Sequence, residues 1–323
     1  MTDITTKRSM IWVLGEALID FVPVMVEGAV AYTPQPGGSP YNAAKAAALA
    51  GADVCFAGAI SNDFFGDMLV ADLHGHKVDT TRAQRSDAPS TLAFVTFVDD
   101  QPRYAFFNNL SSTALIDPSP FAAELRPQDV LLVGSISLID LPGADNIARE
   151  ALECAPGALL AFDPNVRASM VCDWPDWTGR MNRLMEAAGL IKLSIEDLGV
   201  LRPNMSNEVF AAERIAAGAA LIVITDGENG AEAFSSQGRV VAHAPKIAVK
   251  DTVGAGDTLM GALLAELCHF GATQPQTLRA LSLETLNQVL YRAVCAAALN
   301  CTEHGCKPPA RQSVDAWLKG NKA

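Results

Sequence analysis

Short apolar runs alternate with longer segments of helical periodicity along most of this chain. The predicted strands are residues 11–21, 54–59, 130–134, 159–163, 190–194 and 221–226. The predicted helices are residues 41–50, 64–73, 144–155, 181–188 and 208–217. Such alternation is typical of a mostly parallel sheet with helices on both faces. The pattern therefore predicts one three-layer α/β/α domain over residues 1–323, with ligands bound at the carboxyl ends of the strands.

Two stretches break this alternation and look like strands of a separate small sheet. One lies at about 24–36 and the other at about 90–110, where residues 99–102, Asp-Asp-Gln-Pro, form a predicted turn. In the simpler interpretation they form an edge hairpin. In the functional one they form a lid over a substrate, with Phe94 or Phe106 as an apolar wall. The pattern alone does not decide between the two.

The amino-acid composition and net charge of the chain argue against some classes of binding partner. The 323 residues are 50% apolar, enough for a large core, and carry a formal net charge of −12. Nucleic acids and anionic membrane surfaces require a basic face, so we expect neither, whereas ATP needs only local positive potential. The polar N-terminus, and the acidic residues Glu16 and Asp20 in the apolar run that follows it, predict neither a signal peptide nor a transmembrane helix. Seven cysteines without a C-x-x-C pair argue against zinc and suit a cytoplasmic location.

The most informative motif is the heptad DTVGAGD at residues 251–257, which precedes an apolar helical run. Gly254 to Asp257 should lie at the N-terminus of this helix, where backbone N–H groups lack intrahelical partners and the helix dipole favours an anion. Glycines let these N–H groups approach a phosphate closely. Asp257 would then be placed to take a proton from an attacking hydroxyl. The simpler interpretation is a turn followed by an ordinary N-cap aspartate.

Polar residues near the N-terminus are candidates for binding a hydroxylated ligand. Asp20 lies in an apolar strand, so it either caps a turn, pairs with an arginine, or accepts hydrogen bonds from ligand hydroxyls. In the segment PGGSPYNAA at 36–44, Ser39 is the predicted N-cap of a helix and Pro40 its first residue. A helix cap does not account for Gly38 or Asn42.

Residues 162–167, Phe-Asp-Pro-Asn-Val-Arg, end a predicted strand with three polar groups. A local turn accounts for Asp163 and Asn165, since both side chains stabilise turns. A turn accounts less easily for Arg167.

These motifs, in this order, resemble the signatures of the ribokinase-like, or PfkB, carbohydrate kinases, and the resemblance covers nearly the whole chain. It implies that Asp257 is the catalytic base. It also implies that the amides of Gly254, Ala255 and Gly256 form an anion hole for the transferred phosphate, with Arg167 nearby. Neither a Walker A motif nor a G-x-G-x-x-G after the first strand is present, so the P-loop and Rossmann interpretations fail.

The resemblance also implies the substrate side of the site. Asp20, Gly38 and Asn42 match the sugar-binding positions. The small sheet would be a lid, with Phe94 or Phe106 against the sugar, and a contact between two copies of the chain in a homodimer.

The nucleotide side follows from weaker matches. The ATP-binding candidates are Ser194, Thr225, Gly227, Gly256 and Asn300. Asp197 stands where the family has a glutamate that positions Mg²⁺ through water. Asp251, Val253 and Gly305 are candidates for a monovalent cation site, which would hold K⁺.

The sequence favours one sugar substrate and leaves others open. The D-x-N-x-R pattern ending at Arg167 is more similar to fructokinases and 2-keto-3-deoxygluconate kinases than to ribokinases, so phosphorylation of fructose is the leading hypothesis. Where many relatives have F-Y-R-N and then an aspartate, this chain has FFNN at 106–109 and then Thr113, which leaves the sugar open. Ribose, 2-keto-3-deoxygluconate and a nucleoside are the alternative substrates. A sugar-binding regulator without catalysis and a nucleotide-binding structural protein are the alternatives outside the enzymes.

Overall fold

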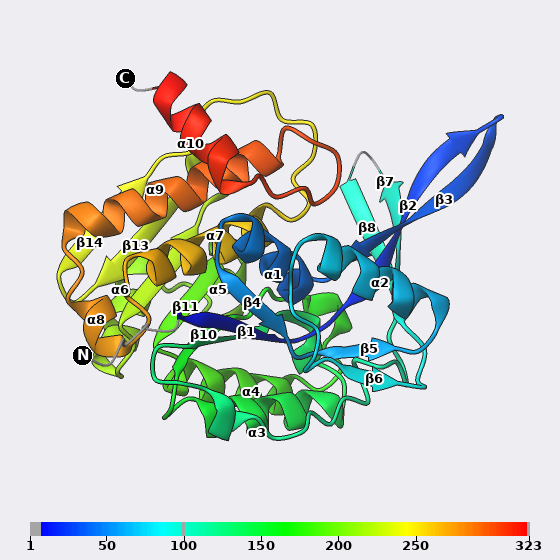
Figure 1. The fold of residues 1–323 in the computed structure, drawn as a ribbon, viewed down its shortest axis with the longest axis horizontal. Helices are drawn as coiled ribbons and strands as arrows, with labels where there is room; N and C mark the ends of the chain where they lie inside the picture. Colours follow the sequence, from blue (N-terminus) through cyan, green and yellow to red (C-terminus); the bar gives the residue numbers. More distant parts are fainter. Residues whose placement is uncertain (1–7, 99–100, 322–323) are drawn as a thin grey trace, which may run out of the picture.

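The computed structural model describes residues 8–98 and 101–321 (Figure 1). Residues 1–7 and the aspartates of the predicted turn at 99–100 lie outside this part of the chain. The main sheet has the strand order β14-β13-β12-β11-β10-β9-β1-β4. The bounds of its strands are β1 Met10–Leu14, β4 Asp53–Phe56, β9 Val130–Gly134, β10 Leu159–Asp163, β11 Leu190–Ser194, β12 Leu221–Thr225, β13 Ala231–Ser235 and β14 Gly238–Ala242.

Neighbouring strands from β4 to β12 run parallel, and β13 and β14 extend the sheet antiparallel. Alternate side chains enter two separate cores. In β9, for example, Val130 and Leu132 join one core, while Leu131 and Val133 join the other. Strands that are apolar on both faces need a helical layer on each side. The predicted three-layer, mostly parallel α/β fold is confirmed.

Helices cover both faces of this sheet (Figure 1). One layer contains α1 Ser39–Leu49, α2 Phe64–Gly75, α7 Ala255–His269, α8 Pro275–Arg279, α9 Leu283–Asn300 and α10 Arg311–Gly320. The other contains α3 Gly143–Cys154, α4 Trp174–Ala187, α5 Ile195–Leu201 and α6 Asn207–Ala216. Short 3₁₀ turns occur at Ala122–Glu124, Ser135–Leu138, Ala168–Met170 and Gly227–Asn229. None of the helices in the described ranges is long and apolar enough to cross a membrane.

The expected separate small sheet is present, in the order β3-β2-β7-β8. Its strands are β2 Leu18–Val26, β3 Ala29–Gly37, β7 Thr91–Val98 and β8 Gln101–Phe107. The far end of the β2–β3 hairpin projects away from the rest of the protein (Figure 1). A two-stranded sheet of β5 Ala59–Ser61 and β6 Gln84–Ser86 lies below it.

The predicted strand at 11–21 is wrong in one respect. The structure divides it into β1 of the main sheet and β2 of the small sheet, so Asp20 belongs to the small sheet. The break begins at Gly15, where a Cβ would lie 2.5 Å from Cγ of Pro40 at the start of α1. Both strands contain buried apolar residues, and the interruption of the apolar run at Glu16 did not by itself indicate a change of sheet.

Helices α1 and α7 approach each other closely at Gly261. A Cβ on Gly261 would lie 2.3 Å from the carbonyl oxygen of Ala43 and 2.7 Å from Cβ of Ala46. Small residues on both helices therefore let the two backbones come together. Gly261 lies about one turn after Asp257, so this contact sets the first turn of α7 against the first turn of α1.

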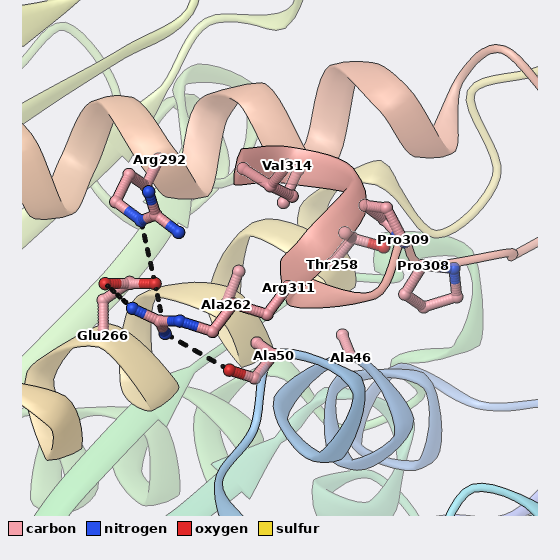
Figure 2. Close-up of a pocket in the computed structure, with 11 residues that line it drawn as sticks. Ala46, Ala50, Thr258, Ala262, Glu266, Arg292, Pro308, Pro309, Arg311 and Val314 are labelled. Carbon is pink, nitrogen blue, oxygen red and sulfur yellow. Dashed lines mark hydrogen bonds and ion pairs between the residues drawn. The ribbon is translucent and has the colours of Figure 1, made fainter. Parts of the chain in front are cut away.

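Further along α7, the buried carboxylate of Glu266 connects three more elements (Figure 2). Its Oε1 lies 3.0 Å from Nε of Arg292 in α9 and 2.7 Å from Nη1 of Arg311 in α10. Arg311 also donates a hydrogen bond of 3.3 Å to the carbonyl of Ala50 at the end of α1. A buried carboxylate is costly unless it is paired. The two arginines meet that requirement and tie α7 to α9, α10 and α1.

Gly261→Ala tests the α1–α7 contact. The added methyl group has no room between the helices, so we expect the free energy of unfolding to fall by about 1–3 kcal/mol. Urea denaturation followed by circular dichroism measures this change.

Gly179→Ala is the matched control, because Gly179 lies in α4 and a Cβ there has nothing within 4 Å. Alanine has the better helix propensity, so this variant should gain about 0.5–1 kcal/mol. Equal responses at the two positions would show that α1 and α7 are not in close contact.

Candidate functional site

Asp257 lies in the first turn of α7, as the heptad predicts. Gly254 is the residue before the helix, with a left-handed φ of 73° that favours glycine. A Cβ on Gly254 would lie 2.2 Å from Sγ of Cys306, so the loop after α9 packs directly on this turn. Ala255 opens the helix, and the N–H groups of Gly256 and Asp257 have no intrahelical acceptor. The turn can therefore bind an anion beside the Asp257 carboxylate.

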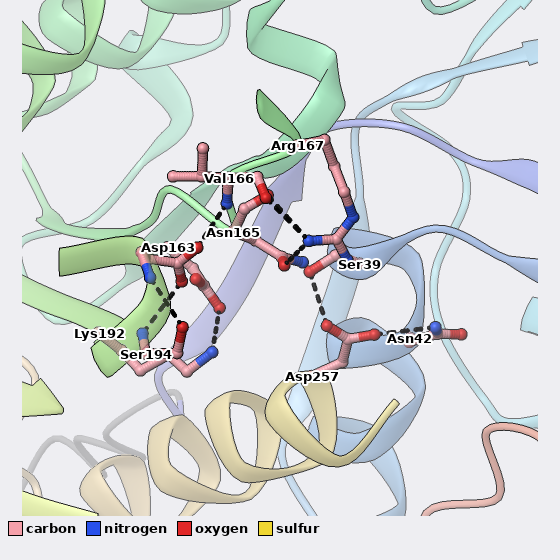
Figure 3. Close-up of polar contacts among 10 residues, drawn as sticks. Ser39, Asn42, Asp163, Asn165, Val166, Arg167, Lys192, Ser194 and Asp257 are labelled. Carbon is pink, nitrogen blue, oxygen red and sulfur yellow. Dashed lines mark hydrogen bonds and ion pairs between the residues drawn. The ribbon is translucent and has the colours of Figure 1, made fainter. Parts of the chain in front are cut away.

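The first turn of α1 holds both oxygens of that carboxylate (Figure 3). Ser39 Oγ donates to Oδ1 of Asp257 at 2.7 Å, and Asn42 Nδ2 donates to Oδ2 at 2.9 Å. The Oδ1 atom of Asn42 is buried without a hydrogen-bond partner. Buried acceptors are rarely left unpaired, so a ligand hydroxyl is a suitable donor for it.

The predicted N-cap role of Ser39 is wrong. The N-cap residue of α1 is Gly38, with φ 109° and ψ 137°, and no side chain caps the helix. Ser39 is already the first helical residue, and its hydroxyl is used for Asp257 instead. A Cβ on Gly38 would lie 2.9 Å from the carbonyl oxygen of Glu16, which explains the glycine in physical terms.

Burial raises the pKa of Asp257 above that of an exposed aspartate. Hydrogen bonds from Ser39 and Asn42 oppose the rise in this pKa, as do the positive charges of Lys192 and Arg167. The carboxylate is thus more basic than in water, while four neighbouring groups stabilise its ionised form.

Asp20 lies near Asp257 across the site. Burial and the negative charge of Asp257 raise the pKa of Asp20 to about 7, and Arg167 partly opposes this. A Cβ on Gly37 would lie 2.3 Å from Oδ2 of Asp20, so this glycine leaves room for the carboxylate. The structure therefore brings Asp20 and Asp257, which are distant in sequence, into one electrostatic environment.

The two candidate phenylalanines, Phe94 and Phe106, lie on opposite faces of the small sheet. Asp20, Ala93 and Phe106 are directly opposite one another across β2, β7 and β8, so their side chains share one face. Phe94 is on the other face, where it stacks on Phe21 with ring centroids 4.5 Å apart. Phe94 is therefore not on the Asp20 face, and only Phe106 keeps its place as a candidate wall. Side chains alternate between the two faces along β7, but the sequence does not show which β7 residue lies opposite Asp20. It therefore could not exclude Phe94 as a wall of the sugar site.

Arg167 follows β10 and is exposed. Its Nη1 donates to Oδ1 of Asn165 at 2.7 Å, and Asn165 has a φ of 37° that folds the turn back (Figure 3). The Arg167 charge lowers the pKa values of both Asp20 and Asp257. It is the exposed cation of the site.

The buried cation of the site is Lys192 in β11, which the motifs did not single out. Its Nζ lies 2.9 Å from Oδ2 of Asp163, and both side chains are buried. Burial acts to lower the pKa of Lys192, but Asp163 and the carboxylates around it outweigh this, so the pKa is raised. Nζ lies 3.1 Å from where a Cβ of Gly256 would be, which places a fixed positive charge beside the anion-binding turn. The sequence signal that could have identified Lys192 was a lysine in the middle of an otherwise apolar strand.

Ser194 and Asp197 form a capping box at the start of α5. Ser194 Oγ accepts from the Asp197 N–H at 3.0 Å, and Asp197 Oδ2 accepts from the Ser194 N–H at 3.0 Å. Oδ1 of Asp197 also accepts from the N–H of Val166 at 2.8 Å, which anchors the segment that carries Arg167. Ser194 is therefore the N-cap residue of α5.

No group of three or more His, Cys, Asp or Glu side chains in residues 8–98 and 101–321 could hold a metal ion. Asp163 nevertheless has a buried Oδ1 without a partner, and burial raises the pKa of Asp163 to about 6 despite Lys192. One or two carboxylates completed by water and phosphate are what Mg²⁺ commonly uses. Asp163 and Asp197 fit that mode, because they lie close enough for the negative charge of Asp197 to raise the pKa of Asp163.

The remaining nucleotide candidates lie at the same edge of the sheet. Thr225 ends β12 directly beside Ser194 of β11, and Gly227 follows with a φ of 45°. They occupy the carboxyl ends of neighbouring parallel strands, where ligands of such sheets bind.

The predicted cation loops also come together. Asp251 accepts hydrogen bonds from the N–H groups of Val253 at 3.0 Å and Gly305 at 2.8 Å. Asn300 is fully buried and braces the same loops, donating to the Val253 carbonyl at 2.8 Å and accepting from the Lys307 N–H at 2.7 Å. Both the nitrogen and the oxygen of the Asn300 side-chain amide are therefore hydrogen-bonded within the protein.

One more buried carboxylate joins the elements of the site. Glu16 accepts from the N–H of Ser39 at 3.0 Å and from the N–H of Ser137 at 3.2 Å, and burial raises its pKa to about 7 against these hydrogen bonds. In sequence it was visible only as an interruption of an apolar run. The whole arrangement presents a held carboxylate, an anion-binding turn and two cations, which is suited to moving a phosphoryl group onto a hydroxyl.

Curated relatives with similar sequences are named fructokinases. The chain is 32% identical over 259 residues to a fructokinase of Rhizobium leguminosarum bv. trifolii, covering 80% of this chain and 79% of that one. It is 31% identical over 334 residues to probable fructokinase-4 of Arabidopsis thaliana, covering 98% of each.

Solved structures share the fold. A fructokinase from Xylella fastidiosa with bound ATP superposes with a TM-score of 0.88 at 22% identity, covering 96% of this chain and 98% of the other. A fructokinase from Vibrio cholerae in a form with fructose, ADP and calcium ion gives a TM-score of 0.82 at 24% identity, covering 96% and 99%. The family model of the pfkB family carbohydrate kinases matches residues 8–312. The chain therefore belongs to the pfkB family of carbohydrate kinases.

Proposed function

We propose that this protein transfers the γ-phosphoryl group of ATP to the primary hydroxyl of fructose, giving fructose 6-phosphate. The observation that carries the proposal is the Asp257 carboxylate, held by Ser39 and Asn42 at the anion-binding first turn of α7. The choice of fructose is supported by the curated relatives at 31–32% identity.

In this mechanism Asp257 accepts the proton of the sugar hydroxyl as that oxygen attacks the phosphorus atom. The backbone at Gly254, Ala255 and Gly256, together with Lys192 and Arg167, stabilises the charge on the phosphoryl oxygens. The transition state of phosphoryl transfer is loose and needs positioning and electrostatics more than a strong base, so an aspartate suffices.

The sugar would lie between the small sheet and α1. Asp20 accepts hydrogen bonds from sugar hydroxyls, the unpartnered Oδ1 of Asn42 accepts another, and the backbone at Gly38 approaches closely. Phe106 forms an apolar wall on the Asp20 face. The small sheet acts as a lid on the single kinase unit formed by the rest of the chain.

ATP would lie along the carboxyl ends of β11 and β12. Ser194, Thr225, Gly227 and the loop braced by Asn300 would contact the nucleotide. Mg²⁺ would be held through water by Asp197 and Asp163, where it neutralises phosphate charge. The loops joined by Asp251, with backbone at Val253 and Gly305, would hold K⁺.

We also propose that the protein acts in the cytoplasm. Its seven cysteines are all free thiols, which suits a reducing compartment that also supplies ATP. Cell fractionation with detection of this chain would check the location.

A coupled assay that detects ADP formation tests the reaction. We expect ATP-dependent turnover with fructose and much lower kcat/KM with ribose, 2-keto-3-deoxygluconate and adenosine. Asp257→Asn should lower kcat by roughly a hundredfold or more, since it removes the base, while fructose binding measured by calorimetry persists.

Asp67→Asn is the matched control for that variant, because Asp67 lies in the first turn of another helix, α2, and is exposed. It should leave kcat unchanged. Near-normal turnover by Asp257→Asn would exclude Asp257 as the base, and a preference for another sugar in the panel would exclude fructose.

Asp20→Asn separates substrate binding from stability. The pKa of Asp20 is raised from 3.8 to about 7 in the folded protein, so the folded state binds a proton more tightly than the unfolded state does. Stability of the wild type is therefore lost as the pH rises between these values. The variant removes this loss and should be more stable than the wild type at about pH 8, with the difference shrinking toward about pH 5.

Urea denaturation at several pH values measures that trend, and KM for fructose should rise by at least about tenfold in the same variant. A stability difference that does not change with pH would contradict the raised pKa of Asp20.

The end of the β2–β3 hairpin suggests a homodimer through the small sheet. Met25, Val26 and Val30 are exposed there, with exposed fractions of 69%, 52% and 62%. Grouped exposed apolar side chains are typical of an interface. We expect a dimer in sedimentation velocity and a monomer for the double variant Met25→Asp, Val30→Asp, whereas a wild-type monomer would exclude the proposal.

A further inference from the structure

The hydroxyl of Ser39 has no structural task in its own helix. The N-cap position of α1 is filled by Gly38, and no side chain caps the helix. Serine at a helix start ordinarily accepts a backbone N–H, and here it does not. Its oxygen instead lies 2.7 Å from Oδ1 of Asp257, in a different helix.

We infer that Ser39 is a positioning residue for phosphoryl transfer, whose O–H keeps Asp257 ionised and directed at the substrate hydroxyl. The inference rests on the proposed role of Asp257 as the base.

The direction of this hydrogen bond is unambiguous. An ionised carboxylate can only accept, and a serine hydroxyl has one hydrogen to give, so Ser39 is the donor. Ser39 is also fixed at its other end, because its N–H donates to Oε1 of Glu16 at 3.0 Å. Glu16 is itself held by the N–H of Ser137 at 3.2 Å. The hydroxyl is therefore presented to Asp257 from a rigid position.

Two donors restrict rotation of the Asp257 side chain. Ser39 binds Oδ1 and Asn42 binds Oδ2, so a turn of the carboxylate would break both hydrogen bonds. Each carboxylate oxygen has a second lone pair, which is free to accept the proton of the substrate. The short serine side chain reaches across only because Gly261 lets α1 and α7 come together.

Several other groups influence the charge of Asp257, and they stay in place when Ser39 is changed. These are Asn42 of α1, Lys192 of β11, Asp163 of β10, Arg167 after β10, Asp20 of β2, Tyr104 of β8 and Cys306 after α9. Removal of the Ser39 hydroxyl therefore subtracts a single hydrogen bond to the charged form of Asp257. The loss should make that carboxylate easier to protonate.

Ser39→Ala tests the inference through the pH dependence of kcat/KM. We expect the acid limb of the profile to move upward by about one pH unit, the size of one hydrogen bond to a charged group. Below the limb, where Asp257 is mostly protonated, this corresponds to a loss of up to about tenfold in kcat/KM relative to the wild type. Ser39→Thr keeps a hydroxyl and should restore most of the wild-type profile.

Ser282→Ala is the matched control, because Ser282 caps α9 through the N–H of Thr285 at 3.1 Å and is remote from Asp257. It should lower the unfolding midpoint without moving the acid limb. If Ser39→Ala behaves in the same way, with a lower midpoint and an unmoved limb, Ser39 is only a structural residue and the inference is overturned.

A second measurement separates this inference from the proposed function. In protein labelled with ¹³C at aspartate carboxyls, the Asp257 resonance is identified by its absence in Asp257→Asn, and its titration is followed by NMR without substrate. We expect a higher midpoint in Ser39→Ala than in the wild type. An unchanged midpoint overturns the Ser39 contact even if the enzyme phosphorylates fructose, whereas a shifted midpoint supports it even if the substrate is another sugar.

Discussion

The close contact of α1 with α7 at Gly261 is the constraint on which the site depends. The two helices belong to opposite ends of the chain, and each contributes an incomplete half to the site. The first turn of α1 contributes two hydrogen-bond donors, and the first turn of α7 contributes a carboxylate and backbone N–H groups without intrahelical acceptors. Because Gly261 lacks a side chain, these turns meet at hydrogen-bond distance, with Ser39 and Asn42 on the two oxygens of Asp257. The Glu266 ion pairs further along α7 hold the same helix against α9 and α10.

The electrostatics of the site work against the stability of the fold. Burial raises the pKa values of Glu16 and Asp20 to about 7 and that of Asp163 to about 6, so near neutral pH these groups are charged at a cost. Lys192 and Arg167 offset part of the cost. Such clustering of perturbed carboxylates is common at functional sites, because a phosphate and its metal ion bring the missing counter-charges. The two apolar cores of the main sheet supply the stability that offsets this cost.

Much of the architecture was predictable because local chemistry determines it. The bounds of β9, β10 and β11 agree with their apolar runs, since each strand is buried on both faces. The helix after the heptad, α7, was predictable because an apolar run with helical periodicity follows the heptad. What the sequence did not reveal depends on contacts across the fold. The break between β1 and β2, the pairing of Ser39 with Asp257, the register that turns Phe94 away from Asp20, and the position of Lys192 beside Gly256 all require knowledge of which segments meet.

A crystal structure of the protein with fructose and a non-hydrolysable ATP analogue tests the role of Asp257 most directly. We expect the C6 hydroxyl of fructose within hydrogen-bond distance of the Asp257 carboxylate, with Ser39 and Asn42 still bound to it and the γ-phosphate analogue at the first turn of α7. A complex in which the sugar hydroxyl lies away from Asp257, or in which the phosphate binds elsewhere than at Gly254 to Gly256, would contradict the proposed mechanism.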